Sequence, residues 1–112
     1  MQQYKIRINE LAEQDLENAG NHIAFKLFNP IAAENMVKGI RKQINKLDMF
    51  PESHELDDDP ILAELGVHKT YYKEYKIFYI IDENEKEVIV VRILHMLVDS
   101  RAWLYRTFGI QS

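Results

Sequence analysis

Hydrophobic and polar residues alternate at the start of the chain, and the period then lengthens to that of a helix. Residues Tyr4 to Ile8 read Tyr-Lys-Ile-Arg-Ile, which predicts a half-buried strand. Asn9 suits the N-cap of a helix that continues to Leu27, because apolar residues recur there every three to five positions. The expected buried face of this helix consists of Leu11, Leu16, Ala19, Ile23 and Leu27.

A second helix is predicted from Ile31 to Leu47. Asn29 precedes a proline and is therefore biased away from helical angles, while Pro30 suits the first turn of a new helix. Because the connection is short, the two helices are expected to form an antiparallel hairpin. The apolar stripe of the second helix consists of Ala33, Met36, Val37, Ile40, Ile44 and Leu47.

The second half of the chain has the composition of β-strands. Runs rich in β-branched and aromatic residues predict three strands, at Val67–Tyr72, Tyr75–Ile81 and Val88–Leu94. The polar residues Asp82 to Lys86 suit a hairpin loop. Val88 to Val91 are apolar on both faces, which favours a central place in the sheet. The acidic stretch up to Pro60 is expected to be loop, and Asp99 to Phe108 is expected to be a short helix.

This order of elements predicts an α+β fold. The N-terminal strand and a three-stranded antiparallel meander are expected to form one sheet, with the helical hairpin packed on one face. A chain of 112 residues is long enough for one core, so residues 1–112 are predicted to be a single domain.

Composition narrows the class of protein. The chain has no cysteine, no apolar run of about 20 residues and no apolar signal-peptide core, so we expect a cytoplasmic protein without a membrane partner. The net charge is −4, whereas a dedicated nucleic-acid binder usually has a basic face. Acidic residues are concentrated between Glu52 and Glu64, and basic residues dominate between Val67 and Lys76, so a local positive surface is still expected.

Three local motifs follow one another in the chain. Lys46–Pro51 carries the second predicted helix into a Phe-Pro turn, and Glu74–Asp82 contains a tyrosine, a basic residue and an apolar-aromatic strand that ends in an acid. Val90–His95 is then followed by Asp99–Trp103, as a last strand with a basic tail. With the order of elements, these motifs resemble the RelE/ParE family of toxins over nearly the whole chain.

The resemblance implies a toxin of a type II toxin–antitoxin module, held inactive by a partner antitoxin. Many family members cut messenger RNA in the ribosomal A site without a metal, and others with the same fold poison DNA gyrase, so the fold leaves the target open. No cofactor is expected, because the four histidines are scattered without zinc-ligand spacing and there is no glycine-rich phosphate loop.

Three residues are candidates for metal-free RNA cleavage, which needs a base, an acid and cations near the scissile phosphate. His95 is the candidate acid or base, because imidazole titrates near neutral pH and His95 ends the last strand; a histidine that caps the sheet edge has the same sequence pattern. The resemblance assigns a phosphate contact to Lys76, where many relatives have a basic residue, and another to Arg101. The alternatives are a solvated strand position for Lys76 and a helix-capping role for Arg101.

Other residues are candidates for substrate binding. They are Lys69, Lys73, Arg92 and Tyr75. Arg92 lies within an apolar strand, where pairing with a structural acid is the favoured alternative. Trp103 and Tyr105 are candidates for base stacking, although core or antitoxin-facing aromatic residues would give the same pattern.

Three hypotheses for function follow. The first is a ribosome-associated messenger RNA endoribonuclease that uses His95, Lys76 and Arg101. The second is a gyrase poison without a nuclease site, which the acidic net charge and the lysine at position 76 favour. The third is an attenuated toxin that acts mainly by binding its antitoxin. All three predict an exposed apolar strip near the second helix or the terminal segment, for antitoxin binding.

Overall fold

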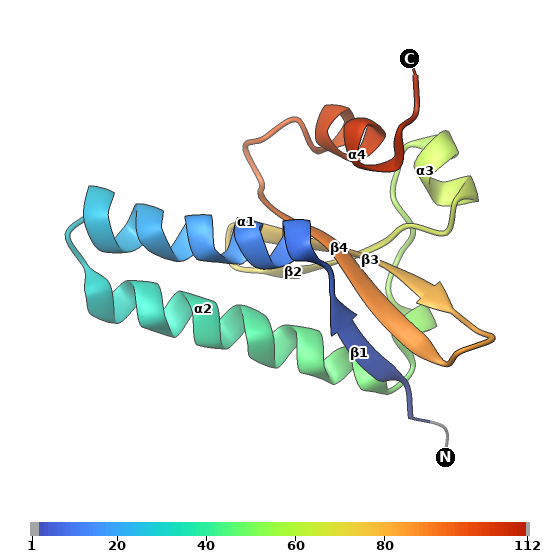
Figure 1. Cartoon of the computed structure of the whole chain (residues 1–112), viewed down its shortest axis with the longest axis horizontal. Helices are drawn as coiled ribbons and strands as arrows, with labels where there is room; N and C mark the ends of the chain where they lie inside the picture. Colours follow the sequence, from blue (N-terminus) through green and yellow to red (C-terminus); the bar gives the residue numbers. More distant parts are fainter. Residues whose placement is uncertain (1–2, 112) are drawn as a thin grey trace.

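The computed structural model describes residues 3–111 and has the expected order of elements (Figure 1). The N-terminal part consists of strand β1 (Lys5–Ile8), helix α1 (Glu10–Asn21), a π-helical turn (His22–Lys26) and helix α2 (Pro30–Asn45). Two 3₁₀ turns (Lys46–Asp48 and Pro51–Ser53) and helix α3 (Pro60–Glu64) follow. The C-terminal part consists of β2 (His68–Tyr72), β3 (Tyr75–Asp82), β4 (Glu87–His95) and α4 (Ser100–Phe108). The α+β prediction is confirmed.

The four strands form one mixed sheet in the order β1-β4-β3-β2. β1 runs parallel to β4, and the β2–β3 and β3–β4 pairs are antiparallel. β4 therefore has neighbours on both sides along Glu87–Val90, which confirms the central place expected for its apolar run. β1 ends at Ile8, so it leaves the C-terminal half of β4 without a strand on that side.

Helices cover both faces of the sheet: the helical hairpin packs on one face, as predicted, and α3 and α4 cover the other. α1 and α2 pack on one face, around a core that includes Leu16, Ile40, Tyr79 and Val90. On the other face Leu62 of α3 and Leu104 of α4 pack with Phe78 and Val91 in a second, smaller core. Neighbouring residues of the inner strands are apolar on alternate faces, so both faces must be covered.

Local sequence explains where the helices begin. The side chains of Asn9 and Asn29 cap α1 and α2 by accepting bonds from Ala12 N (2.9 Å) and Ala32 N (3.0 Å). Asp59 caps α3 in the same way, with Pro60 in its first turn. The loop expected before Pro60 thus continues into a helix that the analysis missed, although an Asp-Pro pair is a helix-start signal. No helix among residues 3–111 is long and apolar enough to cross a membrane.

Candidate functional site

His95 faces the helical layer at the end of β4. Its ring meets the Tyr75 ring edge-on, with centroids 5.2 Å apart, and its Nδ1 accepts a bond from the Leu97 amide at 3.1 Å. This bond places the proton of the neutral ring on Nε2. His95 and Tyr75 line a hollow of about 460 Å³ between α1, β4 and α4, and both also line an adjoining hollow of about 400 Å³ towards α2. His22, which sequence reasoning did not select, lines both hollows as well.

Lys76 lies on the opposite face of the sheet. Tyr75 belongs to the core under the helical hairpin, and side chains alternate along a strand, so its neighbour Lys76 faces α3 and α4. There Lys76 lines a hollow of about 390 Å³ together with Lys69 and Arg101. The acidic run Asp57–Asp59 forms much of the remaining wall.

Carboxylates neutralise two of the three cations in this hollow. Lys69 Nζ lies 3.2 Å from Asp58 Oδ2 and 3.9 Å from Glu55 Oε1, and Lys69 is only 5% exposed. Burial acts to lower the pKa of Lys69, but the hydrogen bond and charge of Asp58 outweigh it and raise the pKa. Lys69 is therefore a buried, paired ammonium group and does not provide a free charge for substrate binding.

Arg101 is paired with the third acid of the run. Its Nε lies 3.1 Å from Asp59 Oδ1, and the buried Tyr105 hydroxyl donates to Asp59 Oδ2 at 2.8 Å. Desolvation acts to raise the pKa of Asp59, but the bonds from Tyr105 and the Leu62 amide and the charge of Arg101 lower it overall. Among the described residues no three histidine, aspartate or glutamate side chains converge as metal ligands.

The three candidates for RNA cleavage, His95, Lys76 and Arg101, therefore do not form one site. The sheet separates His95 from Lys76 and Arg101, because Tyr75 pairs with His95 and Lys76 points the other way. Of the substrate-binding candidates, Tyr75 and Lys73 line a hollow with His95, and Lys69 lies with Lys76. Lys73 is exposed in the β2–β3 turn, with its Nζ 5.7 Å from the centre of the Tyr72 ring.

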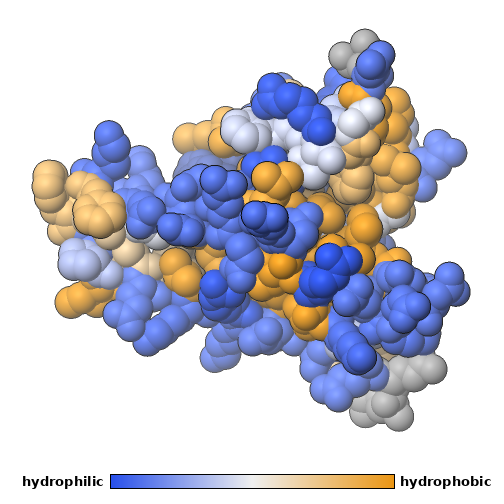
Figure 2. All heavy atoms as spheres, viewed as in Figure 1, coloured by the Kyte–Doolittle hydropathy of each residue, from blue (hydrophilic) through white to orange (hydrophobic). Residues whose placement is uncertain are grey.

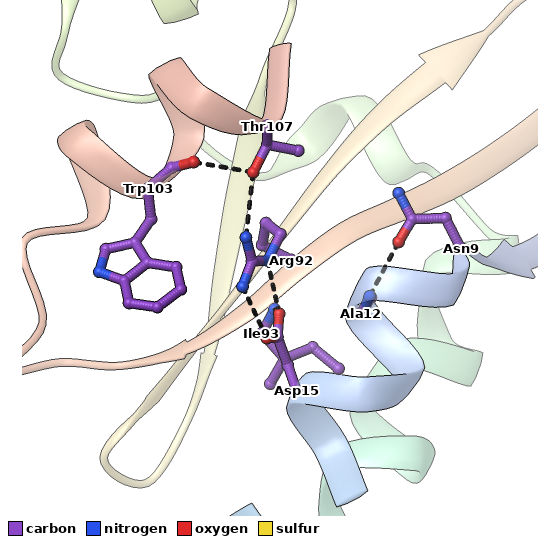
Figure 3. A network of polar contacts seen from close by, with 7 residues as sticks. All are labelled: Asn9, Ala12, Asp15, Arg92, Ile93, Trp103 and Thr107. Carbon is purple, nitrogen blue, oxygen red and sulfur yellow. Dashed lines mark hydrogen bonds and ion pairs between the residues drawn. The ribbon is translucent and has the colours of Figure 1, made fainter. Parts of the chain in front are cut away.

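Arg92 forms a buried polar link between elements on both faces (Figure 3). Its Nε and one terminal nitrogen donate to Asp15 of α1, each at 2.7 Å, and its other terminal nitrogen donates to Thr107 of α4 at 3.1 Å. Asp15 also accepts a bond from the Ile93 amide at 3.0 Å, on the side of β4 that β1 leaves open. Sequence reasoning did not select Asp15; the signal was a carboxylate beside the buried stripe of the first helix.

The two aromatic candidates of the terminal helix have different environments. Tyr105 is buried in the core under α4, which agrees with the core alternative given for it. Trp103 is exposed and contacts two guanidinium groups, because the Cζ atoms of Arg92 and Arg106 each lie 5.0 Å from the centre of its ring. Its indole also lines the larger hollow beside His95.

Solved structures of toxins share this fold. The chromosomal ParDE toxin–antitoxin system of P. aeruginosa matches with a TM-score of 0.69 at 18% identity, over 85% of this chain and 98% of that chain. The RelBE2 toxin–antitoxin complex of Mycobacterium tuberculosis matches with a TM-score of 0.57 at 18% identity, over 85% and 93%. A free mutant of the E. coli toxin RelE matches with a TM-score of 0.64 at 14% identity, over 97% and 99%.

The sequence itself matches one family model. A search of curated proteins found no match. The model of the ParE toxin of the type II toxin–antitoxin system parDE, in contrast, matches residues 6–99, which include both hairpin helices, strands β2 to β4 and all of β1 except Lys5. Since that match extends over most of the chain, the protein belongs to the ParE toxin family of type II toxin–antitoxin systems.

Proposed function

We propose that this toxin arrests growth by binding a protein target, DNA gyrase, and not by cutting messenger RNA. The observation that carries the proposal is the separation of His95 from Lys76 and Arg101 by the sheet. RNA cleavage needs a proton-transfer group and a phosphate-binding cation at the same phosphate. Groups on opposite faces of a sheet cannot reach one phosphate together.

The charge of the Lys76 face supports the same conclusion. A phosphate that entered this hollow would meet the carboxylates of Asp57, Asp58 and Asp59 around the cations. Asp58 and Asp59 already hold Lys69 and Arg101 as ion pairs. Lys76 remains as a single point charge, and a lysine gives no bidentate phosphate contact.

An antitoxin is the expected partner. The family model is that of the toxin of a toxin–antitoxin pair, and two of the matching structures are toxin–antitoxin systems. Exposed apolar side chains lie where part of the antitoxin-binding strip was expected, before α4. They are Met96 and Leu97.

The test compares the two targets in cells. When expression of the wild-type toxin is induced, we expect the DNA-damage (SOS) response and gyrase trapped on cleaved DNA. Transcripts should not be cut at the codon in the ribosomal A site. His95→Ala and Lys76→Ala should arrest growth as strongly as the wild type. New transcript ends cut at ribosome-bound codons, lost in His95→Ala, would support the endoribonuclease instead. Expression without any growth defect would support the attenuated toxin.

A further inference from the structure

The most exposed cluster of large apolar side chains lies at the end of the helical hairpin. Phe25, Leu27, Phe28 and Ile31 are 71%, 60%, 88% and 73% exposed, and all four lie within seven residues of sequence. We call these four residues the hairpin tip. Figure 1 places the α1–α2 connection at the end of the hairpin far from β1, and Figure 2 shows apolar side chains gathered there. A soluble chain rarely exposes several large apolar residues side by side without an interaction site.

The backbone of the tip is locked in a costly conformation. The turn His22–Lys26, which contains Phe25, is π-helical, and Phe28 has a φ of 52°, a left-handed angle that a residue with a Cβ rarely adopts. The Asn29 amide donates to Ile23 O at 3.3 Å, and its side chain caps α2, so the geometry is fixed on both sides. Because Phe28 is almost fully exposed, its side chain gains no packing within the chain in return. Strain of this kind is typical of functional positions.

The charge of the tip differs from that of the rest of the chain. Residues 18–33 contain no aspartate or glutamate, although the net charge of the chain is −4. Within this stretch Lys26 is exposed, and no ion pair of Lys26 occurs in the part of the chain that the structure describes. An apolar knob that carries one exposed lysine and no carboxylate fits an apolar cleft with an acidic rim.

Shape and size disfavour a second copy of the chain as the occupant. The tip is a convex end of the molecule, and two such ends would meet at a small contact. A stable interface buries roughly 800 Å² on each partner, with aromatic anchors placed in pockets near its centre. Four side chains at one end of the hairpin fall short of that area, but they are sufficient to provide the anchors of a contact with a larger, concave partner.

We propose that the hairpin tip is the part of the toxin that enters its target protein. Phe25 and Phe28 are the anchors in an apolar cleft of the target, and Lys26 faces acidic groups at the rim. This inference rests on the proposed function, in which the target is a protein and gyrase is the probe. In this inference the target binds the hairpin tip and not the Lys76 hollow, which lies under α3 and α4 on the other face of the sheet.

The test compares a double variant of the tip with a single-substitution control outside the tip. The variant is Phe25→Ala with Phe28→Ala, and the control is Phe50→Ala. Phe50 is also exposed (60%) and also has a left-handed φ of 51°, but it lies outside the hairpin. We expect both proteins to unfold at nearly the wild-type temperature. The tip variant should lose growth arrest and inhibit purified gyrase at least about 30-fold less well, as hot-spot removal does, whereas Phe50→Ala should match the wild type.

A second pair of variants tests the charge. Lys26→Glu should weaken gyrase inhibition about tenfold at low salt and less at high salt, because rim charges act mainly on association. Lys42→Glu changes an exposed lysine of α2 outside the tip and should have little effect. Equal inhibition by both charge variants would contradict the acidic rim.

The outcomes separate the two proposals. If the wild type arrests growth but leaves gyrase unaffected, the proposed function fails. The inference about the tip is then still tested by growth, because it predicts that the tip variant no longer arrests growth. A tip variant that arrests growth as the wild type does would overturn it. The inference would also be overturned if the tip variant lost only antitoxin binding. The same holds if the wild type sedimented as a dimer and the tip variant as a monomer, since each result would assign the tip to another occupant.

Discussion

Asp15 and Arg92 form a two-point ion pair between α1 and β4, with both nitrogen–oxygen distances at 2.7 Å (Figure 3). Both side chains are nearly buried, and Asp15 also accepts the Ile93 amide. Removal of one partner therefore leaves a buried charge without compensation. We expect Asp15→Ala to lower the free energy of unfolding by about 3–5 kcal/mol, as measured by urea denaturation.

An exposed ion pair between α1 and α2 is the control. Glu13 of α1 contacts Arg41 at 3.0 Å, but both side chains are about half exposed. Glu13→Ala should cost no more than about 1 kcal/mol. An equal loss in the two variants would mean that the buried pair has no special role in stability.

Gly39 of α2 is expected to show a context-dependent effect. A Cβ at this position would overlap the ring and hydroxyl of Tyr72 on β2. Gly39→Ala should therefore destabilise the wild type by about 1–3 kcal/mol through overpacking. In a Tyr72→Ala background the same substitution should stabilise by about 0.5–1 kcal/mol, because alanine is the better helix former. Denaturant unfolding of the four proteins measures the change of sign, and its absence would contradict the close approach.

The contacts of Asp59 predict a pH dependence of stability. Its pKa is lowered in the folded protein, so its contribution is fully present above the pKa of the unfolded chain, about 3.9. That contribution is lost as the pH falls through the lower, folded pKa. The difference in unfolding free energy between the wild type and Asp59→Asn should thus be largest near pH 5–7 and shrink below about pH 4.

Glu85→Gln serves as the control for that titration, because Glu85 is exposed in the β3–β4 loop. Its difference from the wild type should stay small at every pH. A difference for Asp59→Asn that persists unchanged at pH 2–3 would show that the lost contacts do not depend on ionisation.

The left-handed angle of Phe28 predicts that glycine is more stable than alanine at this position. Both substitutions remove an exposed ring, but only alanine keeps the Cβ that the angle disfavours. The free energy of unfolding of Phe28→Gly should be about 1 kcal/mol higher than that of Phe28→Ala. At Lys42, within α2, the order should reverse by a similar amount. If the glycine and alanine variants had the same order of stability at both positions, backbone strain at Phe28 would be contradicted.

Local patterns determined most of the fold, since each depends on neighbouring residues. Alternation and helical spacing gave four strands and both hairpin helices within a few residues, and Asn9 and Asn29 cap the helices as predicted. The missed helix α3 had its own signal at Asp59–Pro60. The π-helical turn at His22–Lys26 lies within a predicted α-helix, and apolar spacing does not distinguish the two forms.

The site was decided by tertiary structure. The sequence supplied His95, Lys76 and Arg101 as chemically suitable residues, but the pairing of Tyr75 with His95 sent Lys76 to the opposite face. It also supplied an acidic run and a basic run, and only the packing of α3 and α4 brought Asp58 to Lys69 and Asp59 to Arg101. Residue type and local period are properties of the sequence alone, whereas the distance between two side chains far apart in the chain depends on strand register and on which elements cover each face of the sheet.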